Sequence, residues 1–381
     1  MTVPTAALPK SLLGHHRLLS PTAGVHVSPI CLGGMSIGSA WSSFMGECSK
    51  ETAFEVLDYF YSQGGNFIDT ANGYQNGESE QWIGEWMELR GRRAEMVVAT
   101  KYTAAFMTYR GEEVLQSNFG GNSKKSLRVS VDLSLKQLRT EYIDLLYVHY
   151  FDWSTSIPEI MQSLHQLVAQ GKVLYLGISD TPAWIVVKAN CYARQHGLTT
   201  FCVYQGRWSA AERDFEREII PMCRDEGMGL APWGTLGGGY FKSPDEEKKT
   251  DGRTLNVKTG KEEQVSVVLD KIAKSKDTLI TSVALAYVLH KAPYVFPICG
   301  GRKVSHLQSN ISALSLRLTE AEIQEIEAAY DFQIGFPHNF ITGGNFAPRG
   351  PQDVLFTKRQ GHLDYVLPER PIEPREEIKE V

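Results

Sequence analysis

The sequence predicts an α/β fold, a (β/α)8 TIM barrel with long loops and a C-terminal extension. Short apolar runs of strand length alternate with amphipathic stretches of helix length along most of the chain. Eight such units fill about 300 of the 381 residues, and a barrel core with insertions takes roughly that length. A doubly wound open sheet is the alternative, but it ordinarily carries G-x-G-x-x-G after its first strand, and Leu32–Gly38 does not fit that pattern.

Composition restricts the class of protein. The chain is 42% hydrophobic and 22% charged, and its formal net charge of −5 leaves no basic excess for nucleic acid. No apolar run approaches the ~18 residues that a membrane span needs, and the first 25 residues lack the apolar core of a signal peptide. The six cysteines form no C-x-x-C pair, and no metal-ligand spacing occurs. We expect a cytoplasmic enzyme that acts on a small molecule without a metal, a membrane or a nucleic acid as partner, and an oligomer is compatible with the sequence.

The expected elements follow in chain order. Strands are predicted over Ser28–Gly33, Asn66–Asp69, Met96–Lys101, Asp144–His149, Val173–Ser179, Cys202–Gln205, Gly229–Trp233 and Val295–Cys299. Helices are predicted over 50–63, 79–89, 124–139, 157–170, 182–195, 213–226, 264–290 and 303–311.

The domain prediction is one barrel over residues 1–332 and an extension over 333–381. The extension holds six of the seventeen prolines, which excludes a long helix there. Insertions are expected at 102–122 and 237–263. Both follow strands, so they fall on the face where barrel active sites lie.

Polar side chains close several consecutive strands of the predicted barrel. Asp69, Lys101 and His149 end strands two, three and four, and Tyr74 follows Asp69 by five residues. Strand ends also become polar simply because loops begin there, but an acid, a lysine and a histidine together form a proton-transfer site. A lysine ammonium beside a phenol favours the phenolate and lowers the phenol's pKa. Tyr74 would then donate a proton to a carbonyl oxygen that His149 orients, while Asp69 holds Lys101.

These residues stand in motifs that resemble the aldo-keto reductase family, over about residues 18–330. Asp69-Thr-Ala-Asn-Gly-Tyr74, Lys101 after Val-Val-Ala-Thr, and Tyr147-Val-His149 are similar to the family's Asp/Tyr/Lys/His tetrad. The resemblance implies that Tyr74, Asp69, Lys101 and His149 are catalytic. Gly-Ile-Ser-Asp-Thr-Pro-Ala-Trp and Ala-Pro-Trp-Gly-Thr-Leu-Gly-Gly-Gly are similar to the fungal aryl-alcohol dehydrogenase and norsolorinic acid reductase-like branch.

The resemblance also implies a nicotinamide cofactor, NADP(H). Ser179 and Asp180 would hold the carboxamide, Trp233 would stack on the nicotinamide ring, and a loop with Leu236, Gly237 and Lys242 would close over the pyrophosphate. The full set of expected contacts is Gly34, Met35, Asp69, Ser179, Asp180, Gln205, Trp233, Gly234, Leu236, Gly237, Lys242, Arg253, Gly300, Arg302, Lys303, His306, Ser309 and Asn310.

Three of these positions depart from the family pattern. Asp180 replaces a common asparagine, His306 an arginine on the 2′-phosphate, and Ser309 a glutamate. Arg302 and Lys303 open the last predicted barrel helix, and two cations at a helix N-terminus suit a phosphate dianion. NADPH is therefore favoured, and NADH is the alternative if His306 and Ser309 leave the phosphate underbound.

Aromatic residues are frequent in the loops expected around the mouth. A substrate pocket of Trp41, Phe106, Tyr150, Trp153 and Trp208 would favour an aromatic or polycyclic aldehyde or ketone, although such rings also serve ordinary packing. The leading hypothesis is a reversible NADPH-dependent carbonyl reductase, with a role in fungal secondary metabolism. The alternatives are a tailoring enzyme with one narrow substrate and a non-catalytic nicotinamide-binding regulatory subunit.

Overall fold

The fold is a barrel of eight parallel strands, as the sequence predicts. A computed structural model describes residues 6–243 and 260–375 of the chain. The strands are hydrogen-bonded in the order β10-β3-β4-β5-β6-β7-β8-β9. A parallel bridge between Leu230 of β9 and Val295, just before β10, brings the two edges of the sheet together. The strands are β3 (Cys31–Gly33), β4 (Phe67–Asp69), β5 (Val97–Tyr102), β6 (Ile143–Val148), β7 (Val173–Ser179), β8 (Phe201–Arg207), β9 (Gly229–Trp233) and β10 (Ile298–Gly300).

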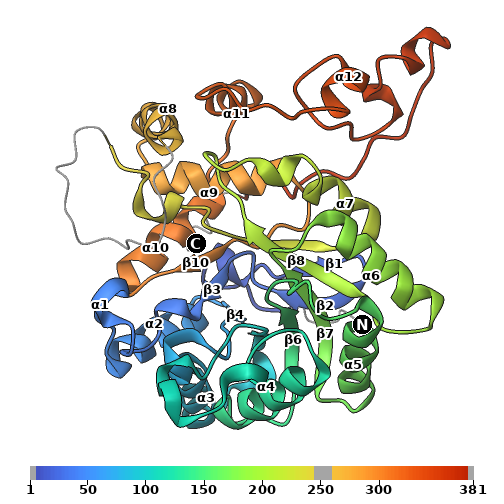
Figure 1. Cartoon of the computed structure of the whole chain (residues 1–381). Helices are drawn as coiled ribbons and strands as arrows, with labels where there is room; N and C mark the ends of the chain where they lie inside the picture. The colour runs from blue at the N-terminus through green and yellow to red at the C-terminus, as the bar shows by residue number, and fades with distance from the viewer. Residues whose placement is uncertain (1–5, 244–259, 376–381) are drawn as a thin grey trace, which may run out of the picture.

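Helices surround the strands, and a few lie outside this ring. The ring contains α2 (Lys50–Ser62), α3 (Glu78–Arg90), α4 (Lys124–Gln137), α5 (Ile157–Ala169), α6 (Ala183–Gln195), α7 (Ile219–Glu226), α9 (Ile280–Lys291) and α10 (Val304–Ser312). The short helix α1 (Ser42–Met45) lies beside α10, and α8 (Lys261–Ser275), α11 (Glu320–Glu327) and α12 (His338–Thr342) lie beyond α9 (Figure 1). No helix in the described ranges is long and apolar enough to cross a membrane.

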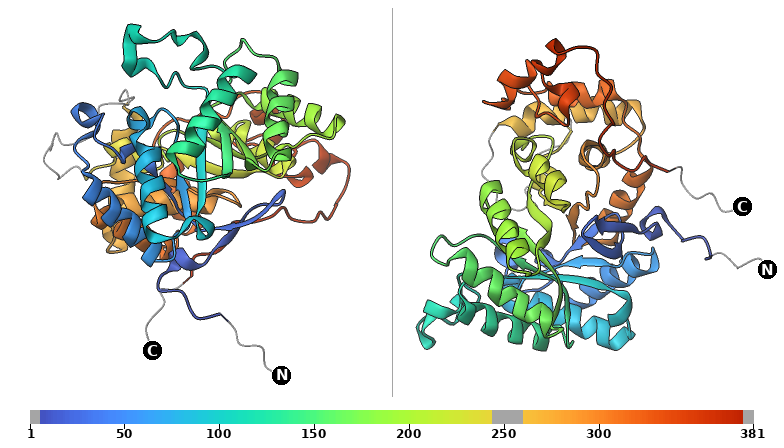
Figure 2. Two further views of the ribbon diagram at one scale, coloured as in Figure 1. Left: turned by 90° about the horizontal axis from the view of Figure 1, so that it is seen from below. Right: turned by 90° about the vertical axis from the view of Figure 1, so that its right-hand side faces the viewer.

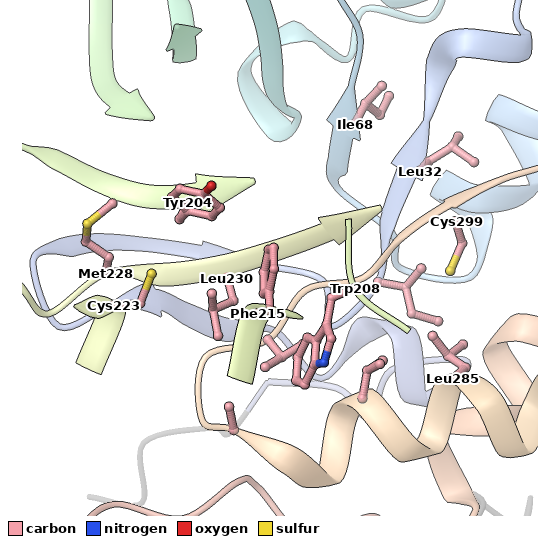
Figure 3. Close-up of a cluster of buried hydrophobic side chains, with 14 of the residues drawn as sticks. Leu32, Ile68, Tyr204, Trp208, Phe215, Cys223, Met228, Leu230, Leu285 and Cys299 are labelled. Atoms are coloured by element: carbon pink, nitrogen blue, oxygen red, sulfur yellow. The ribbon is translucent and has the colours of Figure 1, made fainter. Parts of the chain in front are cut away.

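Two apolar layers hold the barrel together. Every residue of β5 and β6 is buried, as expected for parallel strands covered on both faces. One layer fills the barrel interior, and the other lies between the strands and the helices. Figure 3 shows part of the outer layer, where the ring of Trp208 stacks on Phe215 at 5.7 Å, near Leu285 of α9.

An N-terminal hairpin, which the sequence analysis did not predict, packs against the start of the barrel strands. Its strands are β1 (Arg17–Ser20) and β2 (Ala23–Val27). The amide of Ser28 donates to the side chain of Asn66, just before β4, at 2.7 Å. The hydroxyl of Thr22 donates to the carbonyl of Gly227, just before β9, at 2.8 Å. The hairpin therefore lies at the end of the barrel opposite Asp69 and Trp233.

The helix predicted over 264–290 is two helices, α8 and α9. Asp277 takes a left-handed backbone conformation, with φ of 50°, between them. A right-handed helix cannot continue through that conformation, and the apolar pattern alone did not reveal the break. The helix predicted over 213–226 likewise becomes a 3-10 turn at Asp214–Glu216 followed by α7.

The three predicted additions to the barrel differ in structure. The insertion at 102–122 contains 3-10 turns at Thr108–Glu113 and Gln116–Asn118. Most of the insertion at 237–263 lies outside the described residues. The extension contains α12, five residues long, and then returns toward the N-terminal hairpin (Figure 2). The division into a barrel over 1–332 and an extension over 333–381 stays a prediction.

Candidate active site

The four residues of the expected tetrad meet at the carboxyl ends of β4, β5 and β6. The Nζ of Lys101 donates to Asp69 Oδ1 at 2.5 Å and to the Thr70 carbonyl at 2.7 Å, and it lies 3.3 Å from the hydroxyl of Tyr74. The rings of Tyr74 and His149 stand edge to face with centroids 6.0 Å apart. The structure therefore brings together an acid, an ammonium, a phenol and an imidazole at one point.

A hydrogen bond across the barrel fixes Asp69. The amide of Gln205, on β8, donates to Asp69 Oδ2 at 2.9 Å, so both carboxylate oxygens have donors. Lys101 is fully buried and Asp69 is 3% exposed. A buried ion pair needs such additional hydrogen bonds to offset the cost of removing both charges from water.

Burial and the Lys101 charge shift the pKa of Tyr74 in opposite directions. Burial raises the pKa of its phenol, and the nearby Lys101 ammonium only reduces that rise. The sequence-based expectation of a pKa lowered by Lys101 is thus wrong in its net direction, because the desolvation of a buried phenolate is the larger effect. The phenol of Tyr74 therefore keeps its proton at neutral pH.

Lys101 is a cation, whereas His149 is neutral. Burial lowers the pKa of the Lys101 ammonium, but the interactions with Asp69 and Tyr74 raise it by more. The net effect is a raised pKa. Burial, with a smaller effect of the Lys101 charge, lowers the pKa of His149 to about 3. The buried Nδ1 of His149 has no hydrogen-bond partner among the described residues. A neutral imidazole beside a phenol can orient a carbonyl oxygen without adding a charge.

A second group of side chains ends the neighbouring strands β7, β8 and β9. The hydroxyl of Ser179 donates to Asp180 Oδ2 at 3.2 Å, and the indole N–H of Trp233 donates to Asp180 Oδ1 at 3.3 Å. Asp180 has a left-handed φ of 41°, which turns the chain at the end of β7. Burial raises the pKa of its carboxyl to about 6, against these hydrogen bonds and the charges of Lys101 and Arg207.

A cleft of about 400 Å³ continues beyond Trp233 toward α10. Of the predicted contacts, it is lined by Gly234, Leu236, Gly300, Arg302, His306, Ser309 and Asn310. Ser36 also lines the cleft, and its buried hydroxyl has no hydrogen-bond partner among the described residues. The glycine-rich walls let a ligand approach the backbone closely, as an extended dinucleotide requires. The residues present therefore fit a nicotinamide dinucleotide.

Gly34 has a local reason to be glycine. A Cβ there would lie 2.9 Å from the Asp69 carbonyl oxygen and 3.0 Å from the hydroxyl of Ser79. The next residue, Met35, accepts a hydrogen bond at its carbonyl from the side chain of Gln75 at 3.0 Å. Both residues thus pack against the loop that carries Tyr74.

Cationic side chains lie at the far end of the cleft. The guanidinium of Arg302 lies against Gly46 and donates to the Glu47 carbonyl at 3.4 Å, beside α1. Lys303 is exposed and precedes the first residue of α10. Burial and the charges of both cations lower the pKa of His306, so its imidazole is neutral at pH 7. Arg302 and Lys303 are therefore the charges available for a phosphate group.

Some predicted cofactor residues are sequence neighbours of residues that line the cleft but do not line it themselves. Gly237, Lys242 and Lys303 do not line the cleft, although Gly238 and Gly239 do. Arg253 lies outside the described residues.

The five predicted pocket aromatics occupy different environments. Trp41 contacts the ring of Tyr74 edge to face at 6.3 Å, and Tyr150 lies 6.1 Å from His149. Phe106 is buried against Phe119 at 5.6 Å. Trp153 is 67% exposed and lies beside Trp184, 6.2 Å away.

Trp208, which the sequence analysis placed in the substrate pocket, does not lie there. It is fully buried and stacks on Phe215 in the layer between strands and helices. It lies three residues beyond Gln205, an odd number, so the alternation of side chains that points Gln205 into the barrel turns Trp208 toward the helices.

Sequence reasoning missed Arg207 at the mouth of the barrel. Gln205 points into the barrel, so Arg207, two residues later on the same strand, is on the same face. Its guanidinium lies 5.9 Å from the centre of the Trp233 ring and 3.9 Å from Glu212. The period-two alternation of side chains along β8 is the sequence signal that could have identified Arg207.

Comparison with known proteins agrees with this geometry. The profile of the aldo/keto reductase family matches residues 29–331. The chain is 62% identical to an aryl-alcohol dehydrogenase of Pestalotiopsis microspora, over 97% of this chain and 95% of that protein. It is 59% identical to norsolorinic acid reductase B of Dothistroma septosporum, over 94% of each chain. It is 54% identical to norsolorinic acid reductase A of Aspergillus parasiticus, over 100% of this chain and 98% of that protein.

The class of protein that the barrel and tetrad define is therefore a carbonyl oxidoreductase. The chain belongs to the aldo/keto reductase family, a family that generally uses NAD(P)H. Its similarity to the fungal aryl-alcohol dehydrogenases and norsolorinic acid reductases matches the branch expected from the motifs.

Proposed function

We propose that the protein is an NADPH-dependent reductase of aromatic or polycyclic aldehydes and ketones, which also oxidises the corresponding alcohols, and that it serves fungal secondary metabolism. The observation that carries the proposal is the complete tetrad, with Lys101 held between Asp69 and Tyr74 at the mouth of the barrel. A regulatory binding subunit has no need of all four groups, so the geometry favours catalysis over that alternative.

A nicotinamide dinucleotide held in the cleft would supply hydride to the carbonyl carbon. Tyr74 donates its phenolic proton to the carbonyl oxygen as negative charge develops there. The ammonium of Lys101, 3.3 Å from the phenol oxygen, stabilises the phenolate that remains. Asp69 and Gln205 keep Lys101 in place, and His149 directs the oxygen of the substrate toward Tyr74.

NADPH is proposed over NADH because Arg302 and Lys303 flank the start of α10. A cation at a helix N-terminus suits the 2′-phosphate dianion. The aromatic substrate class is supported by Trp41 and Tyr150, whose rings lie near Tyr74 and His149. The names of the relatives also point to aromatic substrates.

The test is oxidation of NADPH by the purified protein with 4-nitrobenzaldehyde, beside Tyr74→Phe. We expect Tyr74→Phe to lower kcat by at least ~100-fold, the usual contribution of a positioned general acid, while the Kd for NADPH stays unchanged. NADH and a short aliphatic aldehyde serve as controls for cofactor and substrate class. Equal kcat/KM on aromatic and aliphatic aldehydes would overturn the substrate class, and tight NADPH binding without turnover on a panel of aromatic carbonyls would overturn the catalytic assignment.

A further inference from the structure

The N-terminal end of the barrel carries a second hollow, far from the tetrad. The last described segment of the chain, residues 369–375, runs beside the N-terminal hairpin in both views of Figure 2. Two cavities lie between this segment and the hairpin, and Arg17 and Ile372 line both of them. We call this pair the basal cavity.

Three arginines line the basal cavity, Arg17 and Arg370 in the larger part and Arg17 and Arg375 in the smaller, and none has an acidic partner in residues 6–243 and 260–375. Arg17, on β1, is half-buried, and its guanidinium forms no hydrogen bond or ion pair within those ranges. Burial and the like charge of Arg375 lower its pKa to about 10. Arg370 lines the larger part of the cavity with Ile372, and it too is without an ion pair in the described part of the chain.

Among the residues that the structure describes, few acidic side chains lie near these cations. Glu373 is already held by Arg317 at 2.7 Å, which leaves Glu369 as the acidic side chain on the cavity wall. Burial and the charges of Arg375 and Arg17 lower the pKa of His15, so this neighbouring ring adds no further positive charge. Holding a half-buried guanidinium next to another one without a counter-ion is unfavourable, and a bound anion would remove that cost.

The walls of the cavity indicate what kind of anion fits. The larger part, about 440 Å³, has mainly apolar walls from Leu18, Leu289, Pro293, Val295 and Phe296. The smaller part, about 320 Å³, contains Arg375 and His15. An arginine fork matches a carboxylate in bidentate geometry, and the apolar part has room for a ring or a short alkyl chain.

We propose that the basal cavity binds an organic carboxylate with an apolar body, its carboxylate held by Arg17 together with Arg370 in the larger part or Arg375 in the smaller part, and its apolar part against Leu18 and Leu289. The oxyanion chemistry is shared with a simple phosphate ion, and the test separates the two. The site is at the opposite end of the barrel from Tyr74, so it is distinct from the substrate pocket and does not rest on the proposed function.

The test is calorimetric titration of the full chain, saturated with NADP+, with 2-naphthoate, 2-naphthylmethanol and inorganic phosphate. The variant is the double substitution Arg370→Gln/Arg375→Gln, both on exposed side chains, and the control is Arg128→Gln on α4. We expect a naphthoate-binding event that weakens at least tenfold in the double variant and not in Arg128→Gln. We expect kcat/KM for an aldehyde to stay the same in all three proteins, because the substitutions are remote from the mouth.

Three results would overturn the proposal. The first is the same naphthoate affinity in the double variant and in the unaltered chain, since any binding would then belong to the substrate pocket. The second is equal binding of 2-naphthylmethanol or of phosphate, since the site would then recognise only the ring or only the charge. The third is binding seen only in a chain that ends at Arg375, since the acidic residues of 376–381 would then be the natural occupant.

Discussion

Asp180 shows how one side chain at the mouth responds to its surroundings. Its carboxyl accepts hydrogen bonds from Ser179 and Trp233, yet burial raises its pKa from 3.8 to about 6. The carboxylate is therefore less favourable in the folded protein than in the unfolded chain. The penalty is absent below pH ~4, grows between pH ~4 and ~6, and is complete above that range.

Asp180→Asn should therefore stabilise the protein at pH 7.5 relative to pH 4. The difference in unfolding free energy between the variant and the unaltered chain should grow over that range by less than the ~3 kcal/mol that 1.36 kcal/mol per pKa unit would give, because Asp180 is exposed and water screens its charge. Thermal unfolding of both proteins at half-unit pH steps measures it, and other carboxylates cancel in the comparison. If the curves of Tm against pH for the two proteins are parallel, burial of the Asp180 carboxylate does not destabilise the fold.

Among the elements, α3 positions the loop of Tyr74, and its contact with α4 depends on one glycine. A Cβ on Gly84 would lie 2.4 Å from the carbonyl oxygen of Gln137 and 2.6 Å from the Cα of Leu138. Both are backbone atoms at the end of α4 and cannot move independently. The close approach of the two helices therefore requires glycine at this position.

Gly84→Ala should destabilise the protein although alanine is the better helix former. The propensity gain is about 1 kcal/mol, whereas overpacking a well-packed contact costs about 1–3 kcal/mol and here acts on backbone. We expect a net loss of about 1 kcal/mol or more in urea unfolding. The matched control is Gly24→Ala, where no atom lies within 4 Å of the new Cβ. A stabilised Gly84→Ala would mean that α3 and α4 separate easily.

On the scale of the whole molecule, the C-terminal extension packs on the outside of the helix ring. Arg217 donates to the Gln333 carbonyl at 2.7 Å, and the amide of Ile334 donates to the side chain of Asn345 at 2.7 Å. His338 lies 3.1 Å from Glu218 beside α7. These contacts attach the extension to the neighbourhood of α7 and not to the strand ends that carry the tetrad.

A chain that ends at Gly335 should fold, bind NADPH and reduce aldehydes with unchanged KM. It keeps the buried Phe332 and Ile334. It loses the outer contacts, so Tm should fall by about 2–4 °C for each kcal/mol removed. Scanning calorimetry and steady-state kinetics on both chains test this. A large rise in KM would place the extension at the substrate pocket, and the same truncated chain should also lose the naphthoate binding proposed for the basal cavity.

The eight apolar runs of the sequence predict the barrel, because each buried strand leaves such a run, and the residues of the expected tetrad can be located because each follows a strand end or lies in the first loop after it. Tertiary structure decided what depends on spatial neighbours. Trp208 and Arg207 are adjacent in the chain, and the alternation along β8 puts them on opposite faces, but only the packing of the outer layer shows that Trp208 is fully buried and that Arg207 reaches Trp233. The net shift in the pKa of Tyr74 follows from how deeply the phenol is buried, and no spacing in the chain encodes that depth. The basal cavity likewise exists only because residues 369–375 return to the hairpin, and a contact across more than 350 residues leaves no local pattern in the sequence.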